Sequence, residues 1–206
     1  RITREAAILH EIDTYNELIP KAHELSATIL VEIEDKDTRE RFLREAKGLD
    51  PGRLCSYASN SLQTTPERDV AGEMDFIEWN EYYESWFGGD VGTLQRNLEA
   101  IHRAFPDKPV VISEYGYCAC TADRPEDDGR RAEILRTHNA VFRRYPWVAG
   151  LIFFDYNDYR THIGDKGTGV LKQRVHGVVD VFGVRKPSFE ALREECSRHG
   201  AVLIFD

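Results

Sequence analysis

The sequence contains no apolar run near the roughly 18–20 residues that a membrane-spanning helix requires, and it shows no secretory signal. We therefore expect no membrane partner and a cytoplasmic location. Basic residues are also scarce, since 27 lysines and arginines stand against 36 aspartates and glutamates, which gives a net charge of −9. This balance disfavours nucleic acid as a partner, because binding to phosphates needs a basic face.

The sequence also has few residues at the spacings that metal or phosphate chemistry needs. Cys118 and Cys120, two of the four cysteines, are two positions apart, which is not the usual spacing of a zinc knuckle. We interpret the cysteines as reduced thiols. The seven histidines form no metal triad, and His162 and His176 are interpreted as loop residues. No glycine-rich loop precedes a helix, and no Ser or Cys lies in a nucleophile elbow. We predict no metal and no cofactor.

What the sequence does contain is a regular alternation of apolar runs and amphipathic segments. Such alternation is typical of parallel strands that are joined by crossover helices, and therefore of an α/β fold. The expected strands are residues 27–31, 54–58, 76–79, 110–113, 148–154 and 201–205. The expected helices are residues 3–25, 39–48, 91–105, 130–144 and a last one that begins near Pro187. A long polar loop is expected from residue 160 to about residue 177, and a short extended piece at 178–182.

One of these strands runs directly into a carboxylate. Residues 110–113 are Val-Val-Ile-Ser, and Glu114 follows them, with Gly116 permitting a sharp exit. The run at 27–31 ends in Glu32 in the same way. Other polar side chains also follow expected strands, namely Asn60, Asn80, Tyr82, Asp155 and Asp158. Active sites of β/α barrels are built at the carboxyl ends of the strands, so this asymmetry predicts such a barrel.

At these positions the sequence resembles glycoside hydrolase family two, which includes the β-glucuronidases and β-galactosidases. Ile112-Ser113-Glu114-Tyr115-Gly116 resembles the segment that carries the family's nucleophile. Other segments match the family in the same order, and together they cover roughly residues 39–195. They are Leu49 to Arg53, Ser59 to Ser61, Asp75 to Tyr83, Gly150 to Tyr159 and Arg185 to Ser188.

The resemblance implies a retaining glycosidase that hydrolyses a terminal β-linked sugar of the β-glucuronide or β-galactoside type. Glu114 would be the nucleophile that forms the covalent glycosyl-enzyme, and Tyr82 would donate a hydrogen bond to it. A retaining enzyme also needs an acid/base carboxyl group about 5 Å from the nucleophile, and Glu32 is the candidate by position. The side chains implied to line the carbohydrate site are Asn60, Asn80, Tyr82, Trp86, Asp155 and Lys166.

The sequence also departs from the family at several of these positions. Val31 stands before Glu32, where the family has an asparagine, and residues 22–33 could instead match the passage into strand three. Phe154 stands where a tryptophan is common. The Asn-x-Lys pattern of glucuronidases is not visible; Lys166 and Arg174 either bind an acidic sugar in another way or belong to a solvated loop. Trp79 and Trp86 either stack on a sugar or pack in the core.

The length of the chain predicts a partial barrel. A complete barrel needs eight strands and about 250 residues, whereas this chain has 206 residues and five or six expected strands. We therefore expect a single partial barrel over residues 1–206, about strands 4–8, with an atypical segment at 1–38 and the family-like region at 39–195. The alternatives are an inactive fragment, an engineered scaffold that binds carbohydrate weakly, a barrel completed by self-association as a homo-oligomer, or a structural module without a ligand.

Overall fold

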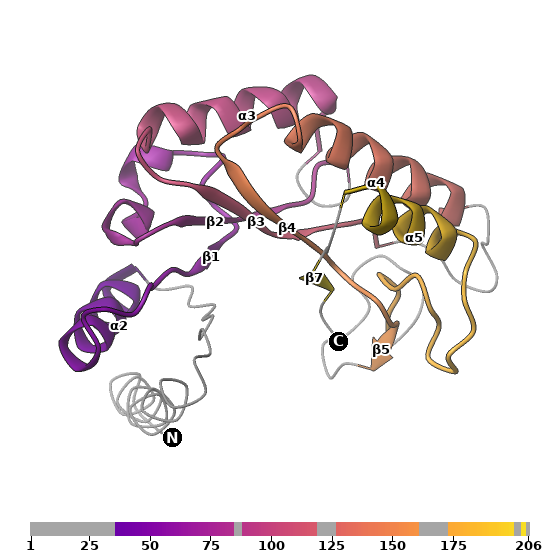
Figure 1. The fold of residues 1–206 in the computed structure, drawn as a ribbon, viewed down its shortest axis with the longest axis horizontal. Helices are drawn as coiled ribbons and strands as arrows, with labels where there is room; N and C mark the ends of the chain where they lie inside the picture. Colours follow the sequence, from indigo (N-terminus) through magenta and orange to yellow (C-terminus); the bar gives the residue numbers. More distant parts are fainter. Residues whose placement is uncertain (1–35, 85–87, 119–126, 161–172, 200–202, 205–206) are drawn as a thin grey trace.

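The computed structural model describes residues 36–84, 88–118, 127–160, 173–199 and 203–204 (Figure 1). Its helices are α2 (Lys36–Leu49), α3 (Val91–Ala104), α4 (Asp127–Phe142) and α5 (Ser188–His199), with short 3-10 turns at Pro66–Arg68 and Val70–Glu73. Its strands are β1 (Ala58–Ser59), β2 (Ile77–Glu81), β3 (Val110–Tyr115), β4 (Val148–Phe153), β5 (Tyr159–Arg160), β6 (Gln173–Arg174) and β7 (Leu203–Ile204).

Five of the described strands form one sheet, in the order β1-β2-β3-β4-β7, and every pairing in it is parallel. Helices α3, α4 and α5 lie on the same side of this sheet, with α5 packed beside α4 (Figure 1). The expected α/β class with crossover helices is confirmed. The arrangement is that of part of a barrel, and the described strands do not close it into a ring.

Helix α3 shows how the sequence sets the position of a crossover. Asp90 caps its first turn, because the carboxylate accepts a hydrogen bond from the backbone N–H of Thr93 over 2.7 Å. Leu94, Leu98 and Ile101 recur at helical spacing and are fully buried against the sheet. Burying each such side chain contributes about 1.5–3 kcal/mol. The helix therefore returns the chain to the start of β3.

The register of the central strands brings the polar side chains together. Ile77 of β2 lies opposite Val110 of β3, and after an irregularity in the ladder Asn80 lies opposite Glu114. Glu114 is the penultimate residue of β3, so the strand extends past the range expected from its apolar residues. This places the carboxylate at the carboxyl end of the sheet, where the resemblance requires it.

Other expectations need correction. The expected strand at 54–58 is reduced to Ala58–Ser59, because Leu54 is exposed and the backbone N–H of Cys55 is held by the Asp75 side chain. The extended piece at 178–182 forms only isolated bridges at Val179. The polar loop after residue 160 returns through β6, which pairs antiparallel with β5. The helix expected at residues 3–25 and the strand expected at 27–31 lie outside the described residues.

None of the helices in the described ranges combines the length and apolar character that a membrane crossing would need.

Candidate active site

The site is centred on a hydrogen bond between β2 and β3. The hydroxyl of Tyr82, directly after β2, donates to Oε2 of Glu114 over 2.7 Å. Tyr82 is 1% exposed, whereas Glu114 is half-buried and so reaches the surface of the site. Burial and the neighbouring Glu114 carboxylate raise the pKa of Tyr82 well above its usual value. Tyr82 therefore keeps its proton and remains a hydrogen-bond donor to the carboxylate.

Asn80 lies opposite Glu114 on the neighbouring strand. It is buried on β2, and its Oδ1 accepts a hydrogen bond from the hydroxyl of Ser113 over 2.7 Å. This bond crosses between the same two strands as the Tyr82–Glu114 bond. The position of Glu114 is thus fixed by a pair of side-chain bonds in addition to the backbone ladder.

Asp155 lies two residues beyond the end of β4 and is only 5% exposed. Burial raises its pKa to about 8; the charges of Asp158 and Glu114 add to this effect, and Arg131 and Lys186 oppose it. Asp155 is therefore largely protonated at neutral pH. Its Oδ1 has no hydrogen-bond partner among the described residues. A neutral carboxyl group with an unused buried oxygen is suited to a hydrogen bond with a sugar hydroxyl.

A close backbone contact joins β4 to the end of β3. The Phe154 N–H donates to the carbonyl of Tyr115 over 3.0 Å. A Cβ at position 116 would lie 2.2 Å from the carbonyl oxygen of Phe154, so only glycine fits there. Gly116 therefore allows the turns that follow Glu114 and precede Asp155 to approach each other.

The segment from Arg174 of β6 to His176 is buried beside this cluster. Arg174 is 7% exposed, and its Nη1 has no hydrogen-bond partner among the described residues. His176 is fully buried, and its ring meets the rings of Tyr82 and Phe154 edge-on, with centroids 6.1 and 5.1 Å apart. Burial lowers the pKa of His176 to about 3, so the imidazole is neutral. The interpretation of Arg174 as part of a solvated loop is wrong, because Arg174 is buried in β6. His176 lies in a loop as predicted, but this loop is buried.

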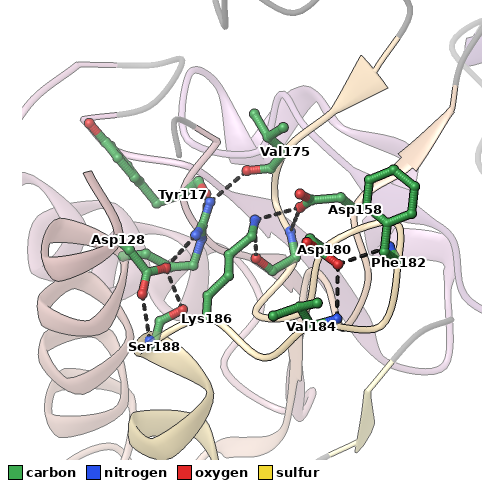
Figure 2. A network of polar contacts seen from close by, with 11 residues as sticks. Tyr117, Asp128, Asp158, Val175, Asp180, Phe182, Val184, Lys186 and Ser188 are labelled. Carbon is green, nitrogen blue, oxygen red and sulfur yellow. Dashed lines mark hydrogen bonds and ion pairs between the residues drawn. The ribbon is translucent and has the colours of Figure 1, made fainter. Parts of the chain in front are cut away.

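Two buried ion pairs hold this segment in place (Figure 2). Arg131 of α4 donates to the carboxylate of Asp128 and to the carbonyl of Val175, each over 2.6 Å. Lys186 donates to Asp158 over 2.7 Å and to the carbonyl of Gly177 over 2.8 Å. The backbone on both sides of His176 is thereby fixed by charged side chains, which explains why a polar segment is ordered below the site.

The structure brings together four of the residues that the sequence predicted for the site, namely Glu114, Tyr82, Asn80 and Asp155. Asn60 lies at the end of β1 and is exposed, and its backbone carbonyl accepts a hydrogen bond from Gln63. Its place in the sugar site stays a prediction, and Glu32, Trp86 and Lys166 lie outside the described residues. Trp79 is fully buried and donates its indole N–H to Gln63 over 3.0 Å, so it packs in the core.

Sequence reasoning missed Ser113, His176 and Arg131 as parts of the site. Ser113 could have been found, because it precedes the strand-end glutamate directly. Nothing local marked His176 or Arg131, since their roles depend on contacts between segments more than 40 positions apart. Across the described ranges, no group of three His, Cys, Asp or Glu side chains could hold a metal ion.

Comparison with known sequences gives two matches to different parts of the chain. Residues 1–77 match the family model described as "Protein of unknown function (DUF3501)", which is less than half of the chain. A curated β-glucuronidase of Streptococcus agalactiae is 27% identical over 157 residues. That match covers 70% of this chain and 24% of the relative, so the chain spans about a quarter of the relative's length.

Solved structures show the same fold. A β-D-glucuronidase of Dictyoglomus thermophilum superposes with a TM-score of 0.78 at 23% identity, over 94% of this chain and 36% of that one. A GH2 β-galacturonidase of Eisenbergiella tayi superposes with a TM-score of 0.75 at 18% identity, over 95% of this chain and 37% of that one. The resemblance to β-glucuronidase-like glycoside hydrolases of family two, stated from the sequence, is therefore confirmed for this portion of their fold.

Proposed function

We propose that this chain is the nucleophile-bearing part of a retaining β-glycosidase and that Glu114 attacks the anomeric carbon of the sugar. The hydrogen bond from Tyr82 to Glu114 is the observation that carries the proposal. Tyr82 holds the carboxylate in one orientation at the carboxyl end of the sheet, and orienting a reacting group lowers the barrier to attack. The likeness to β-glucuronidases supports the same role.

The chemistry requires two steps. Glu114 forms a bond to the anomeric carbon as the bond to the leaving oxygen breaks, and an acid gives that oxygen a proton. Water then attacks the same carbon, the acid residue takes a proton from this water, and the carboxylate of Glu114 leaves. Glu32 is the proposed acid/base, and this role requires its carboxyl group about 5 Å from that of Glu114.

We propose a hexuronide as substrate. The similar proteins are named β-glucuronidases and β-galacturonidases, and one of the latter is described as bound to galacturonate. The buried guanidinium of Arg174 supports an acidic sugar, because Nη1 makes no hydrogen bond with the described residues. Arg174 lies opposite Tyr159 in the β5–β6 pair, and Tyr159 is close enough to Asp155 and Glu114 to feel both charges. A sugar carboxylate would complete the hydrogen bonds of Arg174.

A second candidate is a fold that binds the sugar without hydrolysing it. The chain spans 24% of the curated relative and 36% of the first solved structure, which favours this candidate. A binding site for a hexuronic acid needs Asn80, Asp155 and Arg174, but it does not need an acid/base residue.

Trapping of the covalent intermediate tests the proposal. The protein is incubated with 2-deoxy-2-fluoro-β-D-glucuronyl fluoride, whose fluoride leaves without much help from an acid. We expect mass spectrometry to find one added sugar on the peptide that contains Glu114, and no label in Glu114→Gln. Absence of label in the parent contradicts the catalytic role. If the parent takes no label, calorimetric titration of the parent with glucuronate decides whether it binds the sugar without hydrolysing it.

A further inference from the structure

Arg131 joins two loops that flank Glu114. It lies on α4 and is 0% exposed. Its Nε donates to the carbonyl of Tyr117 over 3.3 Å, three residues after Glu114. Its Nη2 donates to the carbonyl of Val175, between Arg174 and His176. One guanidinium therefore fixes the backbone after the candidate nucleophile and the backbone of the segment below it.

The guanidinium is itself held by a buried carboxylate. Asp128 accepts from Arg131 over 2.6 Å and also accepts from both the backbone N–H and the hydroxyl of Ser188, each over 2.6 Å (Figure 2). These two bonds fasten the start of α5 to the start of α4. The ion pair thus has a fixed position, and Arg131 cannot shift without breaking its bonds to Asp128 and to the carbonyls of Tyr117 and Val175.

The segment that Arg131 holds is in contact with the Tyr82–Glu114 pair. Val175 precedes His176, whose ring packs edge-on against the ring of Tyr82. A displacement of Val175 would pass through His176 to Tyr82, and from Tyr82 to the carboxylate that it orients. Lysine could keep the charge of Arg131, but it lacks the planar fork that reaches Asp128, Tyr117 and Val175 together.

We propose that Arg131 is a positioning residue of this site, holding the loop after Glu114 and the segment of Arg174 and His176 in the geometry that the reaction needs. This inference rests on the proposed function. The positive charge of Arg131 has a second effect, because it opposes the groups that keep Asp155 protonated. The charged and titratable groups around Asp155 are Arg131, Lys186, Asp158, Glu114, Tyr82, Tyr159 and Cys118.

The test compares Arg131→Lys with Arg136→Lys, a control on the same helix. Arg136 is exposed and pairs with Glu194 at the surface. We expect Arg131→Lys to lower the labelling rate of Glu114 by about 10²-fold, since a misplacement of about 1 Å has an effect of that size. The dissociation constant for glucuronate should change less than tenfold, and Arg136→Lys should match the parent in both measurements.

A second variant removes the buried pair without leaving an unpaired charge. Asp128→Asn with Arg131→Gln replaces both charges by neutral amides. We expect Glu114 of this double variant to be labelled more slowly than in the parent. We also expect the titration midpoint of the ¹³C-labelled Asp155 carboxyl, followed by NMR, to rise. In Arg131→Lys, which keeps the charge, the midpoint should stay near that of the parent. A residue that only stabilises the fold would not change the labelling rate of the folded protein.

Labelling of the parent is measured first. If the parent takes no label, the proposed function fails, and the positioning role of Arg131 fails with it. If the parent labels, and folded Arg131→Lys labels within twofold of it, the positioning role is wrong. If neither variant yields folded protein, Arg131 is a core stability residue and the inference fails as well.

Discussion

Tyr82 directly follows β2, Glu114 lies on the neighbouring parallel strand β3, and the two meet through a 2.7 Å hydrogen bond across 32 positions of the chain. Tyr83, the next residue, is also buried, but its ring stacks on His138 of α4 on the helix side of the sheet. Two adjacent tyrosines thus serve different layers of the fold. This pair offers a matched comparison of a site residue and a core residue of the same type.

We predict that Tyr82→Phe lowers the labelling rate of Glu114 by about 10- to 100-fold, because a hydrogen bond to a charged group contributes about 1.5–3 kcal/mol. The rate is measured by mass spectrometry with the fluoro-sugar. Tyr83→Phe is the control and should label at the rate of the parent. Equal rates for the two variants would show that the Tyr82 hydroxyl does not assist Glu114.

Because the pKa of Asp155 is raised, we expect the labelling rate of Glu114 to depend on pH. Its pKa is raised to about 8, so it is a neutral donor below that pH and a carboxylate above it. Above pH 8 the new charge repels Glu114 and the hydrogen bond to the sugar is lost, so the labelling rate should fall about tenfold per pH unit. In Asp155→Asn the amide remains a neutral donor, and the fall should vanish. The same fall in both proteins would assign it to another group.

Arg174 predicts the preference for acidic sugars. We expect Arg174→Gln to weaken glucuronate binding by about 10- to 100-fold, because a charge-assisted hydrogen bond is lost, and to leave glucose binding unchanged. Calorimetric titration measures both constants. Arg193→Gln, at an exposed position on α5, is the control for loss of a positive charge. Equal weakening for both sugars would argue against contact with the carboxylate.

Glu78 predicts a stability change with pH. This side chain on β2 is 1% exposed, its Oε2 has no hydrogen-bond partner among the described residues, and burial raises its pKa to about 7 from 4.5. The pKa of Glu78 is higher in the folded than in the unfolded state. The stability that Glu78 contributes is therefore fully present below pH 4.5 and is lost as the pH rises to about 7. Above pH 7, Glu78→Gln should be more stable than the parent by about 3 kcal/mol.

Urea unfolding at pH 5, 6, 7 and 8 measures this difference. Glu194→Gln on the exposed face of α5 is the control for the change from carboxylate to amide. A difference between Glu78→Gln and the parent that does not grow between pH 5 and 7 would contradict the burial of a charged group at this position.

The close backbone contact at Gly116 leaves no room for a side chain at this position. An alanine Cβ would lie 2.2 Å from the Phe154 carbonyl oxygen, and backbone must move to relieve this contact. We expect Gly116→Ala to destabilise the fold by about 1–3 kcal/mol in urea unfolding and to slow labelling. A Cβ at Gly129 of α4 would meet no other atom within 4 Å, so Gly129→Ala should stabilise the fold by about 0.5–1 kcal/mol. A stable, fully active Gly116→Ala would contradict the close contact.

The sequence predicted those parts of the fold in which local pattern and tertiary packing agree. Helix α3 was expected at 91–105 and occurs at Val91–Ala104, because its cap and its apolar stripe are both encoded locally. The strand that carries Glu114 was also predicted, because its apolar run is encoded locally. The strand at 54–58 was misplaced, because the apolar character of Leu54 suggested burial whereas its side chain is 61% exposed.

The buried polar segment could not be predicted. Arg174 and His176 are typical of a solvated loop by their residue types, but contacts from Arg131, Lys186 and Asp158 hold their backbone in the buried position. Burial of such groups depends on partners from α4 and from the chain before α5, and no spacing within the loop indicates those partners. The candidate nucleophile was thus predictable, but the charges that surround it were not.

The parallel sheet has a consequence for how the chain folds. Its pairings join Ala58 to Glu78, Ile77 to Val110, Val110 to Val148, and Ile152 to Leu203, so each one closes a loop of at least 20 residues. No hairpin can form early in this sheet, and contacts between distant segments slow folding. Helices α3 and α4 are the local structures that can form first. The strand that carries Glu114 gains its neighbours late, and until then its apolar residues are exposed to other chains.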